Sequence, residues 1–184
     1  MKVEFTAIDG IIVFSPDVFY DERGYFFESF SYKKFRESTG LDLLFVQDNE
    51  SFSKFGVLRG LHYQLPPFEQ GKLIRVIKGK VYDVAVDIRP GSKSFGQYFG
   101  IELTDDNKKQ VYIPPGFAHG FVTLSETAVF SYKCTNYYDK ASEAGIKYDD
   151  KYLGINWLIE HQNLIVSDKD KNLPPFEKHA PYGL

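Results

Sequence analysis

The chain has 184 residues, 43% of them hydrophobic and 26% charged, values that are ordinary for a soluble globular protein with a sizeable core. The formal net charge of -3 excludes a global positive field for nucleic acid, so an anionic ligand must be met by local Arg and Lys side chains. No window approaches the ~18 apolar residues of a membrane span, and the N-terminal segment lacks a long apolar run. We therefore expect neither a membrane partner nor a signal peptide.

Short β-rich runs separated by turn residues dominate the chain, a pattern typical of a β sandwich or barrel. In chain order, the expected strands are Val3–Ala7, Ile11–Ser15, Tyr25–Ser29, Leu43–Asp48, Val57–Gln64, Leu73–Ile77, Val81–Ile88, Tyr98–Leu103, Gln110–Ile113, Gly120–Leu124 and Ala128–Tyr137. Tyr32–Ser38 is expected to be a helix, and short elements are expected at Leu153–Trp157 and Leu164–Val166. We expect residues 1–184 to form one domain.

The run Leu73–Ile88 is the clearest candidate hairpin, with its turn at Lys78-Gly79, where glycine allows a positive φ. In its second strand, period two places four side chains on one face, namely Val81, Asp83, Ala85 and Asp87. Lys72 shares a face with branched aliphatic residues of the first strand, so it lies either at the rim of the fold or in a ligand cavity. Periodicity alone favours the rim.

The stretch Gly56–Gln64, GVLRGLHYQ, places His62 in an apolar run that is typical of a buried strand. An imidazole titrates near physiological pH, so His62 is the first candidate base, although a lone buried histidine is more often structural. Tyr132 is the first candidate acid, because a phenol with an ordinary pKa near ~10 is protonated at neutral pH. Period two places its ring inside the fold, and a structural hydroxyl anchor is the competing interpretation.

Five further charged residues could take part in the chemistry, each with a surface charge as the competing interpretation. Asp170 could accept a hydrogen bond from an imidazole and fix its tautomer, but the residues alone do not separate it from Asp168. Lys72 could stabilise a developing oxyanion. Phosphates could be held by Arg23, Arg59 and Lys169.

The chain carries no clear metal or nucleotide-cofactor motif. It has four histidines, and none forms a His-x-His or His-x-x-x-His pair, whereas a catalytic zinc or iron normally needs three protein ligands. There is no P-loop, GxGxxG, CxxC or basic-aromatic nucleic-acid motif. Cys134 is the single cysteine, which excludes an internal disulfide, favours the cytoplasm and is interpreted as packing. We expect no metal, no cofactor and no nucleic-acid partner.

Short blocks in a fixed order resemble the dTDP-4-dehydrorhamnose 3,5-epimerase family across most of the chain. The blocks are DERGYFFE from Asp21, Gln47-Asp48-Asn49, GVLRGLHYQ, Gln70-Gly71-Lys72-Leu73, VYDVAVDIRPGS from Val81, YIPPGFAHGF from Tyr112, Tyr132 with Tyr137-Tyr138, Glu143, and Ser167-x-Lys169-Asp170. The resemblance implies an all-β, cupin-type β jelly roll (a double-stranded β-helix) with a few short helices, working as a metal-free homodimer.

The resemblance also implies a reaction, the inversion of carbons 3 and 5 of dTDP-4-dehydro-6-deoxy-D-glucose, a dTDP-4-keto-6-deoxyhexose, in dTDP-L-rhamnose biosynthesis. His62 would be the base, oriented by Asp170, and Tyr132 would return a proton from the opposite face. Lys72 would steady the enolate oxygen. The nucleotide, pyrophosphate or sugar would be bound by Arg23, Phe26, Glu28, Gln47, Asn49, Arg59, His119, Tyr138, Glu143 and Lys169. The strand from Arg23 to Glu28 would reach the neighbouring subunit's site.

One implied pairing conflicts with regular strand geometry, because Arg59 and His62 would point to opposite faces. Both can reach one ligand only if the strand bulges or twists, and Gly60 is the expected place. Two alternatives remain beside the double epimerase. A mono-epimerase acting on another dTDP-4-keto-deoxyhexose could have identical catalytic residues, and a non-catalytic sugar-nucleotide binder is disfavoured because His62, Lys72, Tyr132 and Asp170 are all present.

Overall fold

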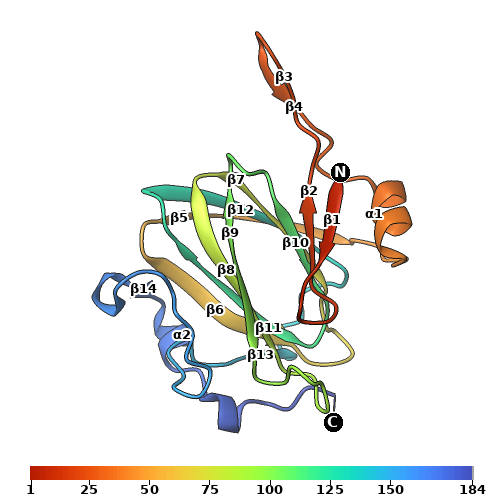
Figure 1. Ribbon diagram of the computed structural model, residues 1–184. Coiled ribbons are helices and arrows are strands. Elements are labelled where there is room, and N and C mark those ends of the chain that lie inside the picture. Colours follow the sequence, from red (N-terminus) through yellow and green to blue (C-terminus); the bar gives the residue numbers. More distant parts are fainter. Residues whose placement is uncertain (184) are drawn as a thin grey trace.

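The computed structural model describes residues 1–183, and two antiparallel sheets form its body (Figure 1). The first sheet has the strand order β1 (Lys2–Phe5), β2 (Ile12–Ser15), β10 (Gln110–Ile113), β7 (Lys72–Lys78), β12 (Thr127–Cys134) and β5 (Gln47–Lys54). The second has the order β13 (Glu143–Gly145), β6 (Val57–Gln64), β11 (Phe117–Thr123), β8 (Lys80–Asp87) and β9 (Tyr98–Thr104), and β14 (Ile165–Val166) pairs in parallel with β6. This is the expected all-β, cupin-like jelly roll.

The remaining elements are short. β3 (Phe19–Asp21) and β4 (Gly24–Phe26) form a separate hairpin that projects from the body (Figure 1). The helices are α1 (Tyr32–Thr39) and α2 (Asp168–Lys171), with single 3-10 turns η1 (His161–Asn163) and η2 (Phe176–Lys178). None of the helices within residues 1–183 is long and apolar enough to cross a membrane.

Apolar side chains fill the space between the sheets and cover both outer faces. The inner cluster joins Ile74 and Phe130 of the first sheet to Val81 and Phe121 of the second. A second cluster packs the C-terminal segment, including Trp157, against the outer face of the second sheet. A third places Phe35 of α1 and residues 41–45 against the outer face of the first sheet. Apolar packing therefore stabilises the inner and outer faces of both sheets.

The expected hairpin across Leu73–Ile88 is wrong. β7 pairs with β10 and β12 of the first sheet, whereas β8 pairs with β9 and β11 of the second. Gly79 carries the chain from one sheet to the other with φ of 83°, and a Cβ there would meet the Thr127 carbonyl oxygen at 2.1 Å. A tight glycine turn between apolar runs therefore marks a sheet-to-sheet crossing here.

The expected strand Leu43–Asp48 is also misplaced, because β5 begins at Gln47 and runs to Lys54. Leu43 and Phe45 alternate as in a strand, but they pack against α1 without pairing. The polar segment that follows is the edge strand of the first sheet. Elsewhere β11 begins at Phe117, which places His119 inside the strand, and β12 ends at Cys134.

Candidate active site

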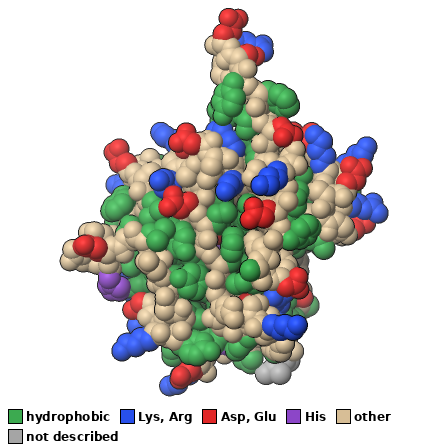
Figure 2. Space-filling model, in the orientation of Figure 1, with side chains coloured by type: hydrophobic (Ala, Val, Ile, Leu, Met, Phe, Trp, Pro, Cys, Tyr) green, Lys and Arg blue, Asp and Glu red, His purple; other side chains and the backbone are tan. Residues whose placement is uncertain are grey.

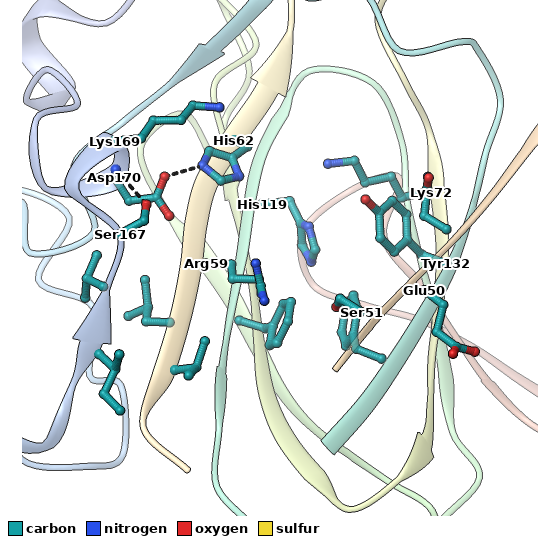
Figure 3. Close-up of a pocket in the computed structure, with 17 residues that line it drawn as sticks. Glu50, Ser51, Arg59, His62, Lys72, His119, Tyr132, Ser167, Lys169 and Asp170 are labelled. Atoms are coloured by element: carbon teal, nitrogen blue, oxygen red, sulfur yellow. Dashed lines mark hydrogen bonds and ion pairs between the residues drawn. The ribbon is translucent and has the colours of Figure 1, made fainter. Parts of the chain in front are cut away.

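A cavity of about 630 Å³ opens between the two sheets (Figure 3). Its walls come from strands of both sheets and from the segment that leads into α2. Four of its lining side chains are the expected catalytic residues, His62, Lys72, Tyr132 and Asp170. The fold thus brings together residues that are more than one hundred positions apart in the sequence.

The His62 imidazole is held by Asp170. Nε2 of His62 lies 2.7 Å from Oδ1 of Asp170, and the Gly60 N–H donates to Oδ2 at 3.2 Å. Burial favours a higher pKa for Asp170, but these hydrogen bonds outweigh burial and hold the pKa below its usual range. A charged Asp170 accepts a hydrogen bond from the Nε2–H of His62, which leaves Nδ1 as the ring nitrogen that can accept a proton, and this second nitrogen is turned away from Asp170 toward the cavity (Figure 3).

The start of α2 separates Asp170 from its neighbour Asp168. Ser167 caps the helix by accepting a hydrogen bond from the Asp170 N–H at 3.1 Å, and the Asp170 side chain points inward, where it is 5% exposed. The Asp168 side chain is 95% exposed and pairs with Lys171. The geometry therefore makes Asp170 the partner of His62 and leaves Asp168 in solvent.

A bulge in β6 lets Arg59 and His62 line the same cavity. His62 is opposite His119 and Arg59 is opposite Phe121, so two residues of β6 face the single residue Gly120 of β11. Gly60 has φ of 133°, and a Cβ there would lie 2.5 Å from the Gly120 Cα. The extra residue shifts the alternation of side chains along β6, so Arg59 and His62 both project toward the cavity.

Lys72 and Tyr132 lie across the cavity from His62 (Figure 3). The Lys72 side chain lines the cavity, so the expectation of a rim position was wrong. Burial lowers the pKa of this lysine, and the negative surroundings oppose that shift. The Tyr132 ring packs on the inner core beside Phe130, and burial raises the pKa of its phenol, which keeps the hydroxyl protonated. An imidazole and a phenol thus stand on opposite walls of the cavity.

His119 belongs to a second buried imidazole–carboxylate pair. Its Nε2 lies 2.9 Å from Oδ2 of Asp83 on β8, and both residues are buried. Burial lowers the pKa of His119, and the Asp83 charge opposes that shift. Asp83 was absent from the expected site residues. The available signal was a carboxylate on the same strand face as Val81 and Ala85, because a buried carboxylate needs a partner.

The expected ligand-binding residues form two linked groups near the cavity. Lys169 pairs with Glu143 at 2.6 Å, and the Tyr138 hydroxyl donates to Glu143 at 3.2 Å. Gln47 donates to Asn49 at 3.0 Å and accepts from the Tyr138 N–H at 3.1 Å. Of this set, the cavity wall includes Asn49 and Lys169.

Arg59 is a cavity-lining cation, with its Nε 3.3 Å from the Ser53 hydroxyl. The exposed fork of this guanidinium is suited to bidentate contact with a phosphate. Apolar cavity residues were not expected from the sequence, and no motif marks them; they are Val57, Leu58, Phe121, Phe130, Ile165 and Val166.

Arg23, Phe26 and Glu28 lie away from this cavity. Arg23 and Phe26 belong to the projecting hairpin, where Arg23 pairs with Asp21, and Glu28 pairs with Lys34 at 2.9 Å. Figure 2 shows apolar side chains on the stem of the hairpin and charged ones at its tip. Phe26 is 70% exposed. The chain does not bring these three residues to its own site.

No group of three or more His, Cys, Asp or Glu side chains within residues 1–183 is arranged to hold a metal ion. His62 and His119 are cross-strand neighbours, and each is already bonded to a buried carboxylate. The arrangement can therefore perform proton transfer, with two imidazoles, a phenol and an ammonium group around one cavity.

Comparison with known proteins places this arrangement in a family. The family model described as dTDP-4-dehydrorhamnose 3,5-epimerase matches residues 5–178. The chain belongs to the dTDP-4-dehydrorhamnose 3,5-epimerase family. It is similar to the enzyme of that name from Shigella flexneri, with 53% identity over 172 residues that cover 94% of each chain.

Solved structures agree with the family assignment. The dTDP-4-dehydrorhamnose 3,5-epimerase from Elizabethkingia anophelis has a TM-score of 0.92 and 52% identity, with 96% of this chain and 97% of that chain covered. A dTDP-6-deoxy-D-glucose-3,5-epimerase from Legionella pneumophila, in complex with dTDP-4-keto-L-rhamnose, has a TM-score of 0.94 and 46% identity, with 100% and 98% covered.

Proposed function

We propose that this protein inverts carbons 3 and 5 of dTDP-4-dehydro-6-deoxy-D-glucose to give dTDP-4-dehydro-L-rhamnose. The observation that carries this proposal is the His62–Asp170 pair facing Tyr132 across one cavity, with Lys72 beside the acid. Family membership supplies the substrate class, and the Legionella relative binds dTDP-4-keto-L-rhamnose, the keto sugar that the proposed reaction forms.

The chemistry follows from the ketone at carbon 4, which acidifies the hydrogens on both flanking carbons. Nδ1 of His62 takes a proton from one of these carbons, and the C–H electron pair moves into an enolate whose oxygen carries the negative charge. The Lys72 ammonium stabilises that oxygen electrostatically. Tyr132 then donates its phenolic proton to the carbon from the opposite face, which inverts the centre. Solvent exchange restores both groups for the second carbon.

The proposed reaction consumes no oxidant or reductant, because each inversion removes one proton and returns another. Lys72 supplies the positive charge that a metal ion supplies in other enolisations, so we propose metal-free catalysis. Arg59 and Lys169 are the cations available for the pyrophosphate. We place the reaction in dTDP-L-rhamnose biosynthesis.

We also propose a homodimer in which each projecting hairpin enters the partner's site. Arg23 and Phe26 lie on the projecting hairpin and Glu28 pairs with Lys34, so none of the three lines its own cavity, while the hairpin's aromatic side chains remain exposed (Figure 2). Exposed aromatic residues on a projecting strand pair are suited to a subunit contact. In this arrangement the hairpin completes the nucleotide-binding part of the neighbouring site.

The proposed function is tested by converting purified substrate and identifying the product by proton NMR. We expect the product to be a 4-keto sugar inverted at both carbons. Its formation should be unaffected by a metal chelator and should be abolished in His62→Ala. Folded His62→Ala that still binds dTDP serves as the control. Unchanged substrate with wild-type protein that binds dTDP would contradict the proposal, and loss of activity with chelator would contradict its metal-free form.

A further inference from the structure

Two loops cross from one sheet to the other at the ends of strands that carry site residues. Residues 65–71 lead from β6 of the second sheet to β7 of the first, and residues 135–142 lead from β12 of the first sheet back to β13 of the second. These four strands carry, in chain order, His62, Lys72, Tyr132 and Glu143. The two loops therefore connect the walls on which the expected site residues lie.

Gln64, the last residue of β6, has a buried amide group that is bonded to both loops. The residue is 6% exposed. Its Nε2 donates to the carbonyl oxygen of Phe68 in the first loop and to that of Tyr137 in the second, the latter at 3.1 Å. Its Oε1 accepts from the Asp139 N–H at 2.8 Å. A buried amide with its donors and its acceptor in use fixes the backbone it is bonded to, because breaking any of these bonds leaves a polar group unpaired.

The contacts with the second loop enclose Tyr138. The Tyr137 carbonyl and the Asp139 N–H lie on either side of it in the chain, and the Tyr138 N–H itself donates to Oε1 of Gln47 at 3.1 Å. Residues 137–139 belong to no strand or helix, so no backbone ladder holds them. The conformation of this loop at Tyr138 therefore depends on two side-chain amides.

Tyr138 is joined in turn to the cavity wall. Its hydroxyl donates to Oε2 of Glu143 at 3.2 Å, and Oε1 of Glu143 accepts from Nζ of Lys169 at 2.6 Å. Lys169 lines the cavity, whereas Tyr138 and Glu143 lie outside its wall. Glu143 is directly opposite Gln64 in the pairing of β13 with β6, so these two side chains project from the same face of the sheet. A continuous path of contacts thus links Gln64 to a cavity-lining cation.

We propose that Gln64 is a positioning residue for ligand binding: its amide holds Tyr138 in place and, through it, the Lys169 ammonium that meets a pyrophosphate. The inference rests on the proposed function, which assigns the pyrophosphate to Lys169. A neutral amide suits this task, because it offers donors and an acceptor in one plane without a charge that would compete for Lys169. A cation held in advance loses less side-chain freedom on binding, so Gln64 adds affinity without touching the ligand.

The test is Gln64→Met, which keeps the length of the side chain but removes its hydrogen bonds. In the protein without ligand, we expect amide hydrogen exchange at Tyr138 and Asp139 to become faster by about tenfold or more, since polar groups of the loop lose their partners. The Kd of dTDP, measured by calorimetry, should rise by about threefold to tenfold, because Lys169 must then be ordered on binding. With the nucleotide sugar, KM should rise by a similar factor while kcat changes little.

Gln70→Met is the matched control, because Gln70 joins the same two loops through a single bond. Its Nε2 donates to the Asn136 carbonyl oxygen at 2.8 Å, two residues before Tyr138. We expect this variant to keep the wild-type exchange rates at Tyr138 and Asp139 and the wild-type Kd of dTDP. Equal changes in the two variants would mean a general loosening of the loops and would overturn the inference.

Gln64→Glu provides the test if Gln64→Met does not fold. It keeps the shape of the side chain and an oxygen that accepts the Asp139 N–H, but it cannot donate to both the Phe68 and the Tyr137 carbonyl. Faster exchange at Tyr138 together with a higher Kd of dTDP is again the expected result. Faster exchange with an unchanged Kd would overturn the inference, because the placement of the loop would then not reach Lys169.

Hydrogen exchange requires neither ligand nor turnover, so it separates this inference from the proposed function. Unchanged exchange in the Gln64 variants would overturn the inference, even if the wild type is an active epimerase. An inactive wild type whose dTDP affinity depends on Gln64 as expected would support the inference and overturn the proposed epimerisation.

Discussion

His62 differs from an ordinary core histidine because a buried carboxylate fixes one ring nitrogen and leaves the other for the cavity. Asp170→Asn preserves an acceptor for Nε2–H but removes the charge that would stabilise the imidazolium formed in the proposed proton abstraction. We expect kcat/KM to fall by about 10²-fold or more. Asp168→Asn, two positions away on the exposed side of α2, is the control and should retain wild-type kcat/KM. Equal losses in the two variants would rule out the pairing as the cause.

Tyr132 makes a separate prediction, because only inversion requires an acid on the face opposite His62. Tyr132→Phe should slow epimerisation by about 10²-fold while leaving proton exchange at carbon 5 partly intact. Rates of inversion and of deuterium uptake, measured on one sample, check this. If the two rates fall equally, Tyr132 is not the acid.

For single residues, the sequence could predict which side chains are chemically suited to proton transfer, but not which residues lie beside them in the fold. His62 and Tyr132 could be chosen because an imidazole and a phenol are suited to proton transfer in apolar strands. Asp170 could not be separated from Asp168 by residue type, since the choice depends on how α2 packs against β6, 108 positions earlier. Asp83 was missed for the same reason, because its partner lies on a neighbouring strand.

The β6 bulge is the element on which the site depends. A Cβ on Gly120 would lie 2.7 Å from the Arg59 carbonyl oxygen and 3.1 Å from the Gly60 Cα, both of them backbone atoms. Gly120→Ala should therefore push β6 from β11, lower the free energy of unfolding by about 1–3 kcal/mol, and reduce kcat/KM.

Val122→Ala in the same strand is the matched control, because its side chain packs on the other face of the sheet. Its free energy of unfolding should decrease by an amount similar to that of Gly120→Ala, while its kcat/KM stays at the wild-type value. Urea unfolding and steady-state kinetics on both variants check the prediction. A Gly120→Ala protein with normal kcat/KM would show that the bulge tolerates the methyl group.

The turn after β8 gives a prediction about acid stability. Burial favours a higher pKa for Asp87, but hydrogen bonds from Arg89, Ser92 and Ser94 prevail and lower the pKa from 3.8 to about 2. The folded-state pKa lies below the unfolded value, so this stabilisation of about 2 kcal/mol is present above pH 3.8 and is lost as pH falls toward 2. Asp87→Asn should therefore lower the free energy of unfolding at pH 7 and have little effect on it near pH 2. Urea unfolding across this range checks it, and a pH-independent cost would contradict it.

Most strands could be predicted from alternation and turn residues, and Val57–Gln64 and Gln110–Ile113 have the expected bounds. The wrong hairpin at Gly79 and the misplaced strand Leu43–Asp48 have physical causes. Strand pairing across Gly79 is decided by which sheet buries each face, and both runs are apolar enough for either pairing. β5 is a polar edge strand whose inner side chains line a cavity, so hydrophobic alternation does not mark it.

At the scale of the whole molecule, the proposed hairpin exchange predicts complementation between two defective subunits. Arg23→Ala carries a damaged hairpin with an intact His62, and His62→Ala carries the reverse. If the hairpin serves the partner, each mixed dimer has one complete site, and co-expressed subunits should recover about a quarter of wild-type kcat/KM through random pairing. Each variant alone should be severely impaired.

A hairpin that serves its own subunit would give no recovery on mixing, which would contradict the exchange.

The jelly roll itself could be predicted from the many short strands in one chain. The proposed dimer does not follow from the strand pattern, because a projecting aromatic hairpin resembles an ordinary turn in the sequence until its exposure in the folded chain is known.

Proton NMR of the keto sugar with the purified protein in heavy water is the most direct test of double epimerisation. We expect deuterium at both carbon 3 and carbon 5, without added metal or nicotinamide, together with inversion at both centres. Deuterium at one carbon only would contradict the double epimerisation and indicate a mono-epimerase. No deuterium at either carbon, from folded protein that binds the nucleotide sugar, would contradict catalysis and leave a binding protein.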